Sequence, residues 1–297
     1  MLLFLIFLLV YILTFITNVL IIMIVSQASN LHSPMYIFIA SLSMLEILYV
    51  SVTTPHMLSI LLVKLKTISF EGCMTQLYVF FSLGCSECFL LTMMAGDRYL
   101  AICYPLRYSS IMTTRMCLQL IIICYVSGFL ASIVTVTFVA QLPFCGSNQI
   151  NHFFCDYPPV VKLSCIKTNA AEIIFLSLSA CLSLVLTCFI LTMASYICII
   201  FTILNSRRGQ RKAFSTCLSH LSVVSMFYGT VIFMYIRPSS KYDLNNDKVV
   251  SVVYSVVTPL LNPLIYSLRN KEFQKAVQHF DLRNIVIFFF KNRKIFM

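Results

Sequence analysis

Charged residues are scarce in this 297-residue chain, where Asp, Glu, Lys and Arg together make up 10%. A soluble globular protein has roughly 25%. So few charges cannot cover a water-exposed surface without leaving apolar patches larger than monomers tolerate. Hydrophobic residues make up 60% and the mean hydropathy is +0.92, so the chain also has ample apolar surface to bury, which excludes disorder. The composition predicts a membrane protein.

Catalytic motifs are also missing. The sequence contains neither a Ser/His/Asp set nor a phosphate-binding loop, and its His residues are scattered (His32, His56, His152, His220 and His279). The net charge is +11, but no basic stripe is interleaved with aromatics as a nucleic-acid surface would be. The basic residues lie instead in short gaps between apolar runs, where they indicate membrane topology. We therefore expect neither an enzyme nor a partner of nucleic acid.

Long apolar runs dominate what is present. A helix needs about 20 mostly apolar residues to cross a hydrocarbon core of ~30 Å. Seven such runs follow one another, roughly Leu2–Val25, Pro34–Val63, Gly72–Ile102, Met116–Val139, Glu172–Leu204, Ala213–Ile236 and Val249–Leu268. After them, Phe273, Ala276, Val277 and Phe280 are spaced as on one face of a helix. The sequence therefore predicts an all-α membrane protein, a seven-transmembrane helix bundle with a short amphipathic C-terminal helix.

The distribution of basic residues predicts the orientation of this bundle. Of 21 Lys and Arg residues, 14 lie in the tail or around the gaps after runs one, three and five, and 7 lie in the opposite gaps. Because basic residues are retained on the cytoplasmic side, the C-terminus is expected in the cytoplasm and the N-terminus outside the cell. No inverted repeat is visible, which weakens a transporter interpretation.

Several motifs lie at corresponding places in these runs. They read Pro34-Met35-Tyr36, Asp97-Arg98-Tyr99, Lys212-Ala-Phe-Ser-Thr-Cys217, Asn262-Pro263-Leu-Ile-Tyr266 and Leu268-Arg269-Asn270. In this order the chain resembles the odorant-receptor branch of the rhodopsin-like G-protein-coupled receptors, and the likeness covers nearly its whole length. The resemblance implies that residues 1–280 form a receptor domain and residues 281–297 a cytoplasmic tail. It also implies a multi-pass protein of the plasma membrane that binds a small, volatile, apolar odorant and activates a stimulatory G protein, raising cAMP.

The inner ends of two runs carry the expected G-protein switch. Asp97 beside Arg98 predicts an ion pair at a helix end, and breaking it would free a five-donor guanidinium for a partner. A flanking acid beside a snorkelling Arg is the simpler interpretation of these two residues alone. The resemblance extends the switch to Tyr99 and to Asn262, Pro263 and Tyr266, with a bend of the seventh run at Pro263.

Two acids lie deepest in the apolar runs. A carboxylate within a membrane costs about 2.5–3.5 kcal/mol on insertion scales and normally marks a functional interior. By resemblance, Glu46, Glu87 and Asn262 border a small cation site, so sodium is the expected ion. The alternative is a proton shared between the two carboxyl groups with no ion bound.

Four cysteines lie on the outer side: Cys73 at the outer end of the third run, and Cys145, Cys155 and Cys165 in the long loop before the fifth run. An oxidising outer face permits disulfides, and four cysteines allow three pairings that the sequence does not distinguish. The resemblance implies the pairs Cys73–Cys155 and Cys145–Cys165, which would tie the long loop before the fifth run over the bundle. Free thiols are the alternative.

A ligand pocket is expected between the outer halves of runs three, five, six and seven, because small-molecule sites form between helices. By resemblance its lining includes Phe80, Phe81, Gly84, Cys85, Tyr228, Tyr235 and Ser255. Taken singly, each of these residues is more often a helix-packing residue than a ligand contact. The outer part of run three has no acid to pair with an amine, which argues against a receptor for biogenic amines.

The chain departs from the family in several places. Gly96 replaces the usual Tyr before Asp97, Tyr125 stands where the superfamily has Trp, and neither Trp nor an Asn-x-Ser/Thr sequon occurs anywhere. These departures leave a truncated, non-signalling receptor product as one alternative. Others are a non-olfactory chemoreceptor, and a transporter or channel that uses Glu46 and Glu87 as an ion path.

Overall fold

The computed structural model describes residues 1–62, 67–145, 148–165, 168–205, 210–235, 244–268 and 271–280. Six long helices are α1 (Leu2–Gln27), α2 (Pro34–Leu62), α3 (Phe70–Cys103), α5 (Thr114–Ala140), α7 (Thr168–Asn205) and α8 (Gln210–Tyr235). A seventh segment consists of α9 (Leu244–Val252), the π-helical η3 (Val253–Val257) and α10 (Thr258–Leu268). Short elements are η1 (Ser29–Leu31), α4 (Pro105–Ile111), α6 (Tyr157–Val161) and α11 (Lys271–Gln278).

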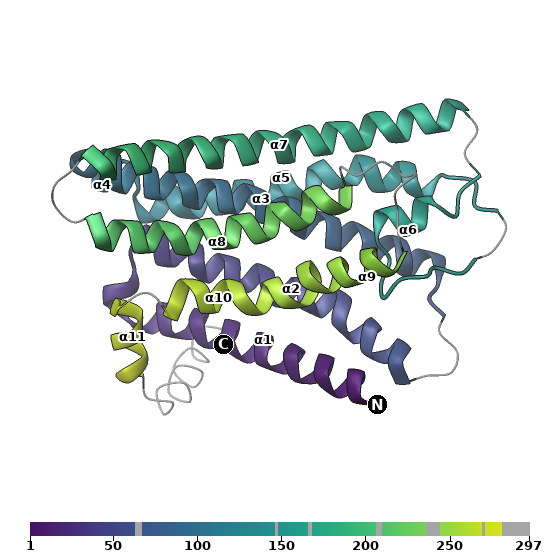
Figure 1. Cartoon of the computed structure of the whole chain (residues 1–297), viewed down its shortest axis with the longest axis horizontal. Helices are drawn as coiled ribbons and strands as arrows, with labels where there is room; N and C mark the ends of the chain where they lie inside the picture. Colours follow the sequence, from purple (N-terminus) through teal and green to yellow (C-terminus); the bar gives the residue numbers. More distant parts are fainter. Residues whose placement is uncertain are drawn as a thin grey trace, which may run out of the picture.

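The long helices lie side by side in one bundle (Figure 1). The N-terminus, α6 and α9 lie at one end of it, which we call the α6 end, and α4 and α11 lie at the other, which we call the α11 end. Within the described residues, five helices are long and apolar enough to cross a membrane, and His220–Tyr235 and Lys248–Asn262 are shorter apolar helices. The predicted seven-helix membrane fold is confirmed, with helix bounds within a few residues of those expected.

Local sequence explains where these helices begin and end. In a bilayer the backbone must satisfy its own hydrogen bonds, so continuous apolar runs fold as helices. The Ser69 hydroxyl accepts a hydrogen bond from the Gly72 amide at 3.1 Å and caps α3. Pro105 disfavours a helical residue before it and is itself favoured at a first helical position, so α3 ends at Cys103 and α4 begins at Pro105.

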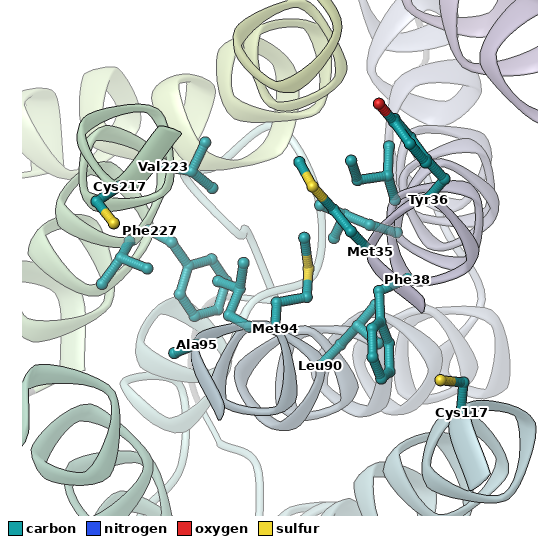
Figure 2. Packing of buried hydrophobic residues seen from close by; sticks show 14 of the residues in the cluster. Met35, Tyr36, Phe38, Leu90, Met94, Ala95, Cys117, Cys217, Val223 and Phe227 are labelled. Atoms are coloured by element: carbon teal, nitrogen blue, oxygen red, sulfur yellow. The ribbon is translucent and has the colours of Figure 1, made fainter. Parts of the chain in front are cut away.

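Helix α3 is the central element of the bundle. In its apolar stretch 67% of the residues are buried, compared with 22% in α1 and in α5. Figure 2 shows Met94 of α3 and Met35 of α2 pointing into the space between their helices, with Phe227 of α8 on the other side. Large apolar side chains on α1 and α5 that remain exposed therefore form the lipid-facing surface of the membrane protein.

Helices α3 and α5 approach closely at Gly128. A Cβ at this position would lie 2.7 Å from the Ser86 backbone nitrogen and 2.8 Å from the Ser82 carbonyl oxygen. Only a residue without a side chain permits this approach. Three residues earlier in α5, Tyr125 contacts a different helix: its hydroxyl donates a hydrogen bond to the Ser41 carbonyl of α2 at 3.0 Å.

The seventh segment contains an irregular turn that the sequence did not predict, ahead of the bend that it predicts at Pro263. Helix α10 continues through residue 263, and the irregular turn lies at η3, which ends two residues before Pro259. Proline has no amide hydrogen and its ring crowds the preceding turn, which accounts for a widened turn there. The Thr258 hydroxyl donates to the Val253 carbonyl at 3.1 Å, the same carbonyl that accepts from the Thr258 amide.

The expected amphipathic helix after the bundle is α11. Its Phe273 is buried, while the neighbouring Glu272 and Lys275 are exposed. The Tyr36 hydroxyl of α2 donates to Glu272 at 3.4 Å, so the Pro-Met-Tyr motif contributes to holding α11 against the bundle. The expected tail, residues 281–297, lies outside the described residues.

Candidate functional site

An apolar cavity lies toward the α6 end between α3, α7, α8 and η3. Five of the expected pocket residues line it: Phe80, Phe81, Gly84, Cys85 and Tyr235. The other lining residues are Tyr49, Cys88, Cys181, Leu182, Val185, Phe227, Val231 and Tyr254. The cavity is therefore walled by aromatic, aliphatic and thiol groups, with Asp and Glu absent from this lining.

Two expected pocket residues lie outside the cavity lining. Tyr228 is buried against Phe189 and Phe227, and its hydroxyl lies 3.5 Å from the Cys88 carbonyl oxygen. Ser255 donates to the Ser251 carbonyl in its own segment at 2.6 Å. Both side chains are engaged in helix packing, the alternative that the sequence left open for every pocket residue.

Asp156, which the sequence analysis did not single out, holds the long loop to the cavity wall. Its carboxylate is fully buried and accepts hydrogen bonds from the hydroxyls of Tyr235, at 2.9 Å, and Tyr254. It also accepts from the Tyr157 amide at 2.7 Å, which caps α6. Because Tyr235 and Tyr254 line the cavity, a ligand that moves either ring also acts on this carboxylate.

A disulfide ties the same loop to α3. Cys73 and Cys155 are joined, with their Cα atoms 5.4 Å apart, an ordinary separation for this bond. Next to it, Gln76 accepts from the Cys155 amide at 3.0 Å and donates to the Val52 carbonyl of α2 at 2.9 Å. The loop residue Phe154 then packs on the cavity-lining Phe80, with ring centroids 4.9 Å apart.

The second disulfide closes the loop on itself. Cys145 and Cys165 are joined, with a Cα separation of 5.8 Å. The Cys165 amide donates to the Pro143 carbonyl at 2.8 Å, and Phe144 forms an antiparallel bridge with Ser164. Both pairs are those that the family resemblance implies.

The two deep acids meet at Asn262 in the middle of the bundle. Asn262 donates from its amide nitrogen to Glu46 and, at 3.2 Å, to Glu87, and all three side chains are buried. Glu46 Oε2 and Asn262 Oδ1 have no hydrogen-bond partner among the described residues. Two carboxylates so enclosed repel one another, so a proton or a cation is needed to compensate them.

An ion pair lies near the α11 end of α3. The Arg98 guanidinium donates to Asp97, from Nε at 3.0 Å and from a terminal nitrogen, and Asp97 is almost completely buried. Tyr108 of α4 donates to the other oxygen of the same carboxylate at 2.7 Å. Burial, followed by the charge of Asp97, raises the pKa of Tyr108, so this phenol keeps its proton and remains a donor.

The remaining switch residues are only partly described. The Tyr99 hydroxyl donates to the Tyr104 hydroxyl at 3.5 Å, away from the ion pair. The side chains of Pro263 and Tyr266 lie outside the described part of α10. Tyr108 was not among the predicted switch residues. It lies 11 residues after Asp97, in the next helix α4, and this short separation in sequence could have indicated that it binds the carboxylate.

Comparison with known proteins gives consistent matches. The family profile described as olfactory receptor matches residues 7–284. Olfactory receptor 11L1 of Homo sapiens is 48% identical over 298 residues, covering 100% of this chain and 92% of the relative. Olfactory receptor 6B9 of Mus musculus is 50% identical over 281 residues, covering 93% and 88%. Olfactory receptor 6N1 of Homo sapiens is 48% identical over 278 residues with the same coverage.

Proposed function

The chain belongs to the olfactory receptor family, and from this premise we propose that its odorant is a small, volatile, apolar molecule bound in the cavity between α3, α7, α8 and η3. The family is one of signalling receptors rather than enzymes. The apolar cavity carries the proposal. Its described lining offers hydroxyl and thiol groups but no carboxylate, so an amine would lose its hydration without gaining a charged partner.

We further propose that odorant binding activates a stimulatory heterotrimeric G protein at the α11 end and raises cAMP. The Asp97–Arg98 pair supports this, because a guanidinium released from its carboxylate presents five donors to a partner. Helix α8 carries cavity residues near its end and continues toward the α11 end, so it can couple the two sites. A ligand shifts this balance only by its differential affinity for the two states.

The α6 end is proposed to face the outside of the cell and the α11 end the cytoplasm, in the plasma membrane. The excess of basic residues in the tail and around the gaps after runs one, three and five of the sequence supports this orientation. The disulfides support it independently, because both lie at the α6 end, and such bonds persist on the oxidising side of a membrane.

Glu46, Glu87 and Asn262 are proposed to hold a sodium ion. The fit rests on two buried oxygens, Glu46 Oε2 and Asn262 Oδ1, that lack hydrogen-bond partners among the described residues. Oxygen atoms are the ligands that hard cations take. A bound cation would compensate the two carboxylates and favour the state in which they lie together.

The test is a cAMP response in cells that display the receptor. Surface staining selects cells with delivered protein, and a panel of apolar odorants is applied to wild type and to Arg98→Ala. We expect at least one odorant to raise cAMP in wild type, and Arg98→Ala to bind the same odorant without raising cAMP. An Arg98→Ala receptor that signals normally would contradict the switch, and a well-displayed wild type that answers only to amines would contradict the ligand class.

A further inference from the structure

Thiols form one wall of the ligand cavity. Cys85 and Cys88 of α3 and Cys181 of α7 line it. The Cys85 and Cys181 sulfur atoms lie 3.7 Å apart, and both side chains are buried from solvent. A ligand in the cavity would therefore meet a pair of sulfur nucleophiles contributed by two different helices.

Two other polar groups of this cavity are less available to a ligand. The hydroxyls of Tyr235 and Tyr254 both donate to Asp156. The two thiols, by comparison, contact each other through a weak S–H hydrogen bond, which an entering sulfur atom can replace at little cost.

The helices that carry the pair are held close together. Two to three turns toward the α11 end, Thr92 of α3 lies 3.4 Å from the Cys188 carbonyl oxygen and 3.3 Å from the Thr192 hydroxyl, both on α7. A disulfide needs its sulfur atoms about 2.05 Å apart, so the two thiols must approach by roughly 1.7 Å. Side-chain rotation with a slight shift of the helices can supply that distance.

From this arrangement we propose that the cavity is a reaction site for small dialkyl disulfides, which are converted to thiols while Cys85 and Cys181 become a disulfide. One cysteine, as its thiolate, attacks a sulfur of R–S–S–R. The ligand S–S bond breaks, and the leaving RS⁻ takes up a proton to give RSH. The second cysteine, again as its thiolate, attacks the protein sulfur of the mixed disulfide, forms the Cys85–Cys181 bond and expels a second RSH.

This sequence is balanced without any other reactant. The two protein thiols lose two hydrogen atoms, and the ligand gains them as two RSH molecules, so the ligand is the oxidant. The alkyl arms of the ligand match the apolar lining. A thiolate is disfavoured in apolar surroundings, so we expect reaction over minutes rather than milliseconds and a rate that rises with pH.

The product would change the receptor for longer than a bound odorant does. A Cys85–Cys181 bond joins α3 to α7 inside the cavity and persists after the ligand has left. The inference rests on the proposed ligand cavity, but its chemical readout is independent of signalling. An odorant panel that gives no cAMP while the bond forms would count against the proposed function alone.

The experiment uses the whole receptor in membranes, exposed to dipropyl disulfide or to dipropyl sulfide, which has no S–S bond. Peptide mapping without reduction then follows Cys85 and Cys181, and the released propanethiol is counted. We expect a Cys85–Cys181 peptide and two propanethiol molecules per receptor with the disulfide, and neither with the sulfide. Cys217→Ser, which removes a buried thiol of α8 outside the cavity lining, should react like wild type.

Single-cysteine variants test the two-step course. Cys85→Ser and Cys181→Ser should each stop at a mixed disulfide that carries one propylthio group on the remaining thiol of the pair. If Cys85 and Cys181 of the treated wild type can both still be alkylated after denaturation, the proposal is wrong. It is equally wrong if Cys217 is lost as fast as the pair, since the reaction would then not belong to the cavity.

Discussion

Asp156 connects three parts of the molecule through one carboxylate. It caps α6, receives the Tyr235 hydroxyl of α8 and receives the Tyr254 hydroxyl of η3. A hydrogen bond to a charged group is worth about 1.5–3 kcal/mol, so this residue should matter more than its place in a loop suggests.

Asp156→Asn keeps the size of the side chain and removes its charge. We expect it to lower the thermal stability of the purified receptor by an amount equivalent to about 1.5–3 kcal/mol and to weaken the odorant response. Glu71→Gln, which alters an exposed acid of α3, is the control and should change stability little. In a double-mutant cycle with Tyr235→Phe the two effects should not add, and full additivity would show that the two residues do not interact.

Tyr108 holds the second oxygen of Asp97 while Arg98 takes the first. Tyr108→Phe removes this restraint and should raise basal G-protein activation, by up to about tenfold if the bond is worth about 1.4 kcal/mol. Because the pKa of Tyr108 is raised, the effect should not vary between pH 6 and 8. Tyr104→Phe alters a tyrosine hydroxyl that bonds only Tyr99 among the described residues, and an equal rise there would contradict the assignment.

The Asp97–Arg98 pair could be predicted from the sequence, whereas the contacts of Asp156 could not. Asp97 and Arg98 are adjacent, so their pairing could be inferred directly. Asp156 is separated from Tyr235 by 79 residues and from Tyr254 by 98, and nothing local indicates that they meet. Only the packing of the loop against α8 and η3 creates this contact.

At the scale of elements, two glycines that both lie inside long helices differ in the space around them. A Cβ at Gly96 of α3 would meet no atom within 4 Å, whereas one at Gly128 of α5 would lie 2.7 Å from the Ser86 backbone nitrogen. Gly96 is the position where the family usually carries Tyr, and open space at this site agrees with a side chain being tolerated.

The two positions form a matched pair of substitutions. Gly96→Ala should stabilise the receptor by about 0.5–1 kcal/mol, because alanine restricts the unfolded backbone and no contact opposes it. Gly128→Ala should destabilise it by about 1–3 kcal/mol, because α3 and α5 must separate. Thermal unfolding in one detergent measures both, and a Gly128→Ala receptor as stable as wild type would contradict the close approach.

The positions of the helices were largely predictable, because each helix corresponds to a continuous apolar run in the sequence. Irregular turns within a helix were not predictable in this way. The sequence predicts a bend at Pro263 but did not indicate the irregular turn at η3 before Pro259. Either proline removes a backbone donor, so the sequence alone does not indicate which turn of the segment widens. The pocket residues were likewise predicted only in part. The four expected residues of α3 line the cavity: Phe80, Phe81, Gly84 and Cys85. Tyr228 and Ser255 lie outside the lining and pack within the bundle.

At the scale of the whole molecule, Glu46 of α2 and Glu87 of α3 both accept hydrogen bonds from Asn262 of α10, so three transmembrane segments are linked near their middle. If sodium binds Glu46, Glu87 and Asn262, replacing Na⁺ by a bulky organic cation at constant ionic strength should raise basal G-protein activation. Glu87→Gln removes one charge and should raise the Na⁺ concentration for half effect by about fivefold or more. Wild type and Glu87→Gln receptors that respond identically to Na⁺ would favour a shared proton in place of the ion.

The central claim is that an odorant in the cavity near the α6 end controls a G protein at the α11 end. Its most direct measurement is nucleotide exchange on a purified stimulatory G protein by the receptor in lipid nanodiscs, with an activating apolar odorant. We predict that the odorant accelerates exchange in wild type and in Leu191→Phe, which alters an exposed, lipid-facing side chain of α7. Gly84→Phe fills the cavity, and we predict that it loses this acceleration. An odorant that accelerates exchange equally in Gly84→Phe and wild type would contradict the account.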